Sequence, residues 1–101
     1  MEIIYNEISR LTKQSNTNIW KRLAKLTEEI GEVAEAISSS NNELGCSYKE
    51  KTKEDIFEEL CDIIIVSLSM TSLDEDKDIT DIKTMINKKL IKWNDNLMQR
   101  R

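Results

Sequence analysis

Two short acidic clusters contain the residues whose types and spacing could do chemistry. The first spans residues 28–32 (Glu-Glu-Ile-Gly-Glu) and the second spans residues 58–62 (Glu-Glu-Leu-Cys-Asp). In each cluster two carboxylates stand three residues apart, so on a helix they share one face and repel each other. Two such pairs facing each other would be strongly unfavourable without a cation between them. The pattern therefore predicts a metal site held between two helices.

The chain contains no histidine, which narrows the chemistry of such a site. Without imidazole it lacks the usual general base, the usual zinc ligand and every histidine-dependent catalytic triad. Any bound metal must then be held by oxygen, which favours Mg²⁺ or Mn²⁺. The two cysteines, Cys46 and Cys61, are expected as free thiols.

Composition predicts a single all-α domain across residues 1–101. The chain has no proline, two glycines and 5% aromatic residues, a poor supply for turns and strands. A net charge of −4 without a dominant basic patch argues against nucleic-acid binding. The longest apolar stretch, 63–66, is too short to span a membrane, and the N-terminus does not resemble a signal peptide. We therefore expect a soluble, cytoplasmic protein.

Apolar residues at helical spacing predict four helices, over about residues 3–13, 19–38, 52–73 and from 80 onwards. Thr17 or Asn18 is expected to cap the second helix. A capping box formed by Thr52 and Asp55 should open the third. Thr80 or Asp81 should start the fourth, and a polar loop is expected over 38–51.

The positions of the acidic residues on the two central helices indicate whether they form a functional site or only a solvated surface. On the second helix the apolar stripe is centred near Leu26 and Ile30, with Glu29 on its flank. On the third helix, positions 55, 59, 62, 66, 69 and 73 follow the spacing of a packing seam that is acidic in its first half. The run 63–66 is expected to be buried on all sides. Glu59 and Asp62 would thus lie at the mouth of a helix–helix interface.

The two clusters together resemble the signature of the MazG-like all-α nucleoside triphosphate pyrophosphohydrolases, which is Glu-Glu-x-x-Glu, a spacer and Glu-x-x-Asp. The matching segments here are Glu28–Glu32 and Glu59–Asp62, and the likeness covers about residues 20–73 well and the fourth helix loosely. The resemblance implies a four-helix bundle-type subunit that assembles as a homo-oligomer, either a dimer or a tetramer. It also implies hydrolysis of a nucleoside triphosphate to a monophosphate and pyrophosphate.

The resemblance also assigns roles to residues. The magnesium ligands would be Glu29, Glu32, Glu59 and Asp62, with Glu28 as an accessory acid. Lys25 would act on the phosphates from the same ridge. Further substrate contacts are expected from the lysines and base-binding side chains Lys51, Lys89, Trp20, Tyr48 and Asn94. Because the triphosphate and the four carboxylates are both strongly negative, divalent cations would have to separate them.

Other functions fit the same motifs. A related enzyme of this fold could act on deoxyuridine triphosphate or phosphoribosyl-ATP. A helical oligomerisation or adaptor module could carry the acids merely for solubility. A degenerate homologue that binds nucleotides without hydrolysis is disfavoured, because all four ligand positions are intact.

Overall fold

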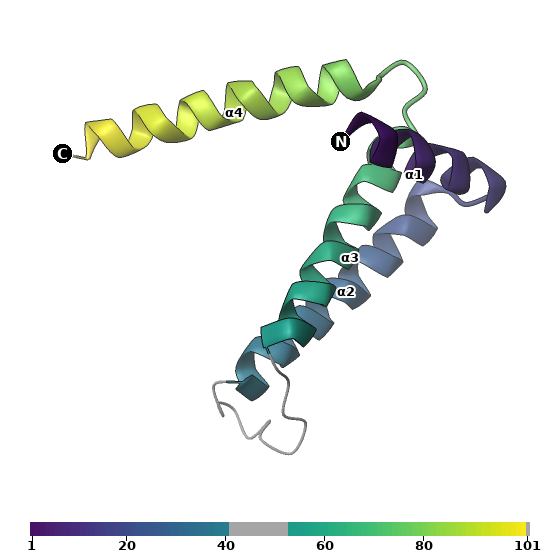
Figure 1. The fold of residues 1–101 in the computed structure, drawn as a ribbon, viewed down its shortest axis with the longest axis horizontal. Helices are drawn as coiled ribbons and strands as arrows, with labels where there is room; N and C mark the ends of the chain where they lie inside the picture. The colour runs from purple at the N-terminus through teal and green to yellow at the C-terminus, as the bar shows by residue number, and fades with distance from the viewer. Residues whose placement is uncertain (41–52, 101) are drawn as a thin grey trace.

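Four α-helices make up the part of the chain that the computed structural model describes, residues 1–40 and 53–100. They are α1 (Glu2–Gln14), α2 (Ile19–Ser40), α3 (Lys53–Ser72) and α4 (Ile79–Gln99) (Figure 1). No strand occurs in these residues, which confirms the all-α prediction. None of the four helices, over the same residues, combines the length and apolar character needed to cross a membrane.

Side-chain caps define where two of the helices begin. The Oδ1 atom of Asn18 accepts a hydrogen bond from the backbone N–H of Lys21 at 2.9 Å, so the predicted cap of α2 is confirmed. The predicted start of α4, at Thr80 or Asp81, was wrong by one or two residues. The helix starts at Ile79, because Asp78 and Asp81 form a reciprocal capping box, with bonds of 3.1 and 2.9 Å. Thr52, the predicted cap of α3, lies outside the described residues.

The first three helices pack together, whereas α4 leaves them as a projecting arm (Figure 1). Helix α3 lies against both α1 and α2. The Cα radius of gyration is 16.7 Å, well above the about 13 Å of a compact domain of this length. The four-helix bundle expected within one subunit is therefore not formed by the described residues, because the fourth helix points away from the other three.

A small apolar core joins α1, the end of α3 and the base of α4. Tyr5, Ile8 and Leu68 are buried, and the first turns of α4 contribute Ile79 and Ile82. This cluster fixes the direction in which the arm leaves the rest of the chain.

A buried pair of hydroxyls links α1 to α3 below this core. The Oγ1 of Thr12 and the Oγ of Ser69 are 2.6 Å apart, and Thr12 also donates to the carbonyl of Ile8 at 2.7 Å. Both side chains are buried, at 6% and 2% exposure. Both hydroxyls have a hydrogen-bond partner. The pair therefore holds α1 in one position along α3 without leaving a buried polar atom unsatisfied.

Helix α2 presents a different face to α3 than its apolar stripe predicts. The buried residues are Glu29, Val33 and Ala36, whereas Ile30 is 51% exposed. Glu29 therefore lies in the packing seam rather than on its flank, and the prediction of a stripe centred near Leu26 and Ile30 was wrong. The buried positions 29, 33 and 36 are spaced by four and three residues, which is typical of a helix that packs along another helix.

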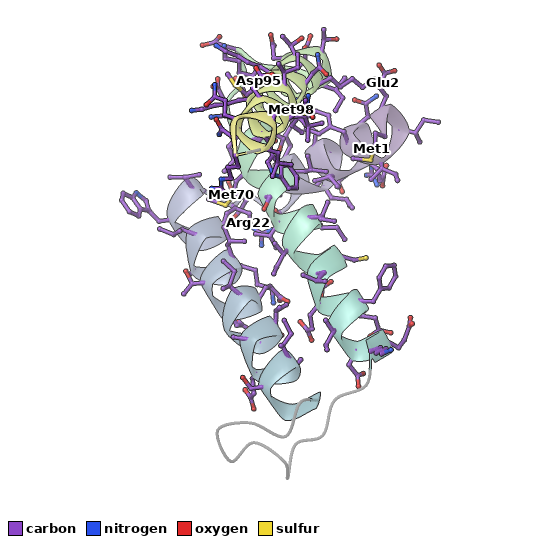
Figure 2. All side chains as sticks on the ribbon, turned by 90° about the vertical axis from the view of Figure 1, so that its left-hand side faces the viewer. Met1, Glu2, Arg22, Met70, Asp95 and Met98 are labelled. Carbon is purple, nitrogen blue, oxygen red and sulfur yellow. The ribbon has the colours of Figure 1, made fainter. Side chains whose placement is uncertain are left out.

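Much of the apolar surface of α2 and α3 faces outward. On α3, Val66 is buried, but Ile64 and Ile65 remain 54% and 47% exposed, so burial of residues 63–66 on all sides was a wrong prediction for the single chain. Figure 2 shows α2 and α3 side by side, with α4 seen nearly end-on above them. The outer faces of both helices carry further exposed apolar side chains, namely Leu23, Ile37, Phe57 and Leu60.

Candidate metal-binding site

Three carboxylates from two helices meet in the α2–α3 seam. Glu29 comes from α2, and Glu59 and Asp62 come from successive turns of α3. One oxygen of each lies within 4.8 Å of an oxygen of the others. Glu29 also belongs to a second group of the same size with Glu28 and Glu32 on its own helix. The structure thus brings the two acidic clusters of the sequence together, with Glu29 common to both groups.

Two oxygens in this group are buried without a hydrogen-bond partner. They are Oε2 of Glu29 and Oε2 of Glu59, and Glu29 as a whole is only 4% exposed. A buried carboxylate oxygen with no donor is costly, because it loses its water without replacement. Oxygens left in this state are the ones that a cation would satisfy.

Within this group the carboxyl of Glu59 has a raised pKa. The neighbouring carboxyl of Glu32, burial and the carboxyl of Glu29 together raise the pKa of Glu59 to about 7. This shift arises because a second ionised carboxylate beside the first is unfavourable unless a proton or another cation lies between them. It also shows that Glu32 on α2 acts directly on Glu59 of α3.

Lys25 neutralises part of the charge. Its Nζ lies 3.0 Å from Oε1 of Glu29 and 3.7 Å from Oε1 of Glu28. The hydrogen bond from this ammonium lowers the pKa of Glu29 and raises that of Lys25. Glu29 is therefore ionised at neutral pH, with one oxygen paired to Lys25 and the other free to accept a ligand.

The oxygen-only group fits a hard divalent cation. Ligand oxygens about 2.1 Å from one Mg²⁺ lie about 3 to 4 Å from each other. The oxygens of Glu29, Glu59 and Asp62 lie within 4.8 Å of one another, close to that range, and small rotations of the Glu59 and Asp62 side chains would close the difference. Asp62 is exposed, and Glu59 is half-buried, which leaves room for water and phosphate on the same ion.

The other predicted site residues lie further from this group or outside the description. Trp20 is 75% exposed at the start of α2. Lys89 and Asn94 are exposed on the α4 arm, which points away from the carboxylates of its own chain (Figure 1). Lys51 and Tyr48 lie outside the described residues. The phosphate and base contacts therefore stay predictions.

Arg22 is a candidate that the motif analysis passed over. It lies seven residues before Glu29 on α2, hence on the same face two turns away. Its Nε is buried and has no hydrogen-bond partner among the described residues, and its label in Figure 2 lies between α2 and α3. The spacing 22, 26, 29, 33 would have revealed it, had the seam rather than the most apolar stripe been taken as the buried face.

Comparison with known protein families gives one match, and it covers most of the chain. The sequence model of the MazG nucleotide pyrophosphohydrolase domain matches residues 17–98, which include both acidic clusters and most of α4. No curated protein and no solved structure gives a match. Because the match covers most of the chain, the protein belongs to the MazG nucleotide pyrophosphohydrolase domain family.

Proposed function

We propose that this protein is a Mg²⁺-dependent nucleoside triphosphate pyrophosphohydrolase, which converts a nucleoside or deoxynucleoside triphosphate and water to the monophosphate and pyrophosphate. The observation that carries the proposal is that Glu29 and Glu59, whose carboxylates meet from different helices, each hold a buried oxygen without a hydrogen-bond partner. When both groups are ionised they are acceptors only, and a metal cation between them satisfies both at once.

Four carboxylates would hold the metal, namely Glu29, Glu32, Glu59 and Asp62. Mg²⁺, or Mn²⁺ in its place, would polarise the α-phosphate and lower the pKa of an attacking water. The protein groups orient this chemistry from α2 and α3, because rigid helices place the oxygens more accurately than loops. Glu28 is the accessory acid beside them, at the exposed edge of the group.

Positive side chains would neutralise the phosphates. Lys25 already contacts two carboxylates and could turn to a phosphate oxygen once a divalent ion replaces it beside Glu29. We assign further phosphate or base contacts to the predicted residues Lys51, Lys89, Trp20, Tyr48 and Asn94. The large exposed apolar area of α2, α3 and α4 supports self-association, as a dimer or tetramer.

The test is pyrophosphate release from a panel of nucleoside triphosphates with and without Mg²⁺. The panel includes deoxyuridine triphosphate and phosphoribosyl-ATP, which represent the related activities. We expect Mg²⁺-dependent release that is lost in Glu59→Gln and Asp62→Asn, with the circular dichroism spectrum of a folded helical protein retained. Glu58→Gln, an exposed neighbour on the same helix, is the matched control and should keep its activity.

The competing function is a non-catalytic oligomerisation module, which the exposed apolar faces also favour. In that case Mg²⁺ would not change the melting temperature, and Glu59→Gln and Asp62→Asn would be neutral or stabilising. If no substrate released pyrophosphate and Mg²⁺ did not change the melting temperature, the proposed enzymatic function would be refuted.

A further inference from the structure

Arg22 is a cation in the α2–α3 seam without an anion beside it. The side chain is half-buried, and Figure 2 shows it between the two helices. Its Nε atom is buried without a hydrogen-bond partner, and the guanidinium makes no ion pair with any residue of the ranges 1–40 and 53–100. Burial of a charged donor without an acceptor is costly, because the group loses its water without replacement. The position therefore suits an anion that the described part of the chain does not supply.

The helices packed around Arg22 offer no acid at its level. Residues 63–72 of α3 contain no charged side chain. Because α2 and α3 run in opposite directions, this uncharged stretch lies beside the first half of α2 (Figure 1). On α1, the acids Glu2 and Glu7 already contact basic side chains of α4 and α1. An anion at Arg22 is therefore expected to come from a ligand.

Charge is divided along α2. Residues 8–27 contain five basic residues and no acid, whereas residues 28–35 contain four acids and no basic residue. Arg22 and Glu29 share one face of the helix and stand seven residues apart, which is about 10 Å along the axis. A metal at the carboxylates and a guanidinium two turns away would give one seam two separate positive groups. That arrangement suits a ligand with several linked negative groups, such as a chain of phosphates.

We propose that Arg22 binds the terminal phosphates of a nucleoside triphosphate, so that the triphosphate lies along the α2–α3 seam with its β- and γ-phosphates towards the start of α2. This assignment rests on the proposed function, in which the metal acts on the α-phosphate. A side chain two helical turns from the carboxylates then meets the phosphates that follow. The guanidinium presents five N–H donors in a planar fork and holds a phosphate through two parallel hydrogen bonds, which a lysine does not reproduce.

The contact would act on the leaving group of the proposed reaction. Water adds to the α-phosphorus and loses a proton, the bond from this phosphorus to the bridging oxygen breaks, and that oxygen leaves with the pyrophosphate. Negative charge therefore increases on the pyrophosphate as the bond breaks. A guanidinium fixed beside these phosphates stabilises this charge in the transition state. Arg22 should thus support both substrate binding and turnover.

The contact can be observed at the Nε–H group of Arg22. The full chain, labelled with ¹⁵N-arginine, is titrated with inorganic pyrophosphate in the presence of Mg²⁺, and the Nε–H signals are followed by NMR. We expect the Arg22 signal, assigned with Arg22→Lys, to shift as the site fills. The Arg10 signal is the internal control and should stay in place, because its Nε already donates to Glu7 at 3.1 Å.

An unchanged Arg22 signal at saturating pyrophosphate would overturn the proposal, whether the anion binds elsewhere or does not bind. The measurement needs no turnover, so it is separate from the test of the reaction. A protein in which pyrophosphate shifts the Arg22 signal, but which releases pyrophosphate from no triphosphate, would refute the proposed reaction and keep the contact. The opposite result would keep the reaction and refute the contact.

The strength of the contact is tested by isothermal titration calorimetry with the same probe. Arg22→Gln should weaken the binding of pyrophosphate about 10- to 100-fold, the effect of losing a hydrogen bond to a charged group. Arg22→Lys keeps the charge but loses the fork, and should recover only part of this loss. Lys21→Gln removes the same charge from the exposed neighbouring residue and should weaken binding about threefold or less. Equal losses in Arg22→Gln and Lys21→Gln would show attraction by net charge alone and would contradict the contact.

A purely structural role of Arg22 is tested on the protein without ligand. Arg22→Gln replaces an unpaired guanidinium by a neutral group, so the melting temperature of the free protein should not fall. Pyrophosphate with Mg²⁺ should raise the melting temperature of wild type more than that of the variant. A lower melting temperature of the free variant with unchanged affinity for pyrophosphate would make Arg22 a packing residue. A lower particle mass in light scattering would assign its anion to a second copy of the chain, and either result would overturn the proposal.

Discussion

Binding of magnesium should release a proton, and its amount follows from the environment of Glu59. The carboxyls of Glu32 and Glu29, together with burial, raise the pKa of Glu59 to about 7 in the metal-free protein. A metal ligand must be ionised, so the ion has to displace this proton. The fraction of protonated Glu59 predicts a release of about 0.9 proton at pH 6, 0.5 at pH 7 and 0.1 at pH 8.

Isothermal titration calorimetry measures this release directly. Mg²⁺ is titrated into the protein in two buffers with different ionisation enthalpies at each pH, and the difference in heat gives the number of protons. Below pH 7 the apparent affinity should rise about tenfold per pH unit, and above pH 8 it should level off. Glu58→Gln should behave like wild type. Equal heats in both buffers at pH 6, with Mg²⁺ clearly bound, would refute the assignment of the shared proton to Glu59.

Three further predictions concern stability and are measured by urea or thermal unfolding without metal. The folded-state pKa of Glu59 lies above the 4.5 of the unfolded chain, so its contribution is fully present below pH 4.5 and is lost as the pH rises through 7; wild type should lose stability over this range, and Glu59→Gln should lose less. Ser69→Ala removes the 2.6 Å hydroxyl contact and should cost about 1 kcal/mol, while an unchanged midpoint would argue against that contact. Asp78→Ala removes the cap of α4 and should cost about 1 kcal/mol of helix stability, with exposed Glu75→Ala as the neutral control.

The four helices could be predicted from the sequence because they depend on local spacing. The cap at Asn18 required only the positions of side chains along the chain, whereas the approach of Glu29 to Glu59 and Asp62 depends on the packing of α2 against α3. The buried face of α2 could not be predicted in the same way. Periodicity identifies the most apolar face, whereas α3 packs on the face that carries Glu29 and Ala36.

Two features of the structure could not be predicted from the spacing of residues along the chain. The raised pKa of Glu59 depends on Glu32 and Glu29 from the other helix, and no spacing within α3 contains that information. The course of α4 depends on the packing of Ile79 and Ile82 against a cluster that includes Tyr5 and Ile8 of α1, about 75 residues earlier in the chain. Both are products of packing between distant segments rather than of local preference.

The small core around Tyr5 and Ile8 has a consequence for the direction of α4. The connection between α3 and α4 covers residues 73–78, a length with which helices commonly reverse direction and pack on each other. The connection itself therefore does not force α4 outward. The outward course comes from α1, whose apolar side holds the first turns of α4. Shortening α1 from its N-terminus, or placing a charge at Ile8, would release the arm to fold back on its own α3. The N-terminal helix thus helps to set the direction of α4.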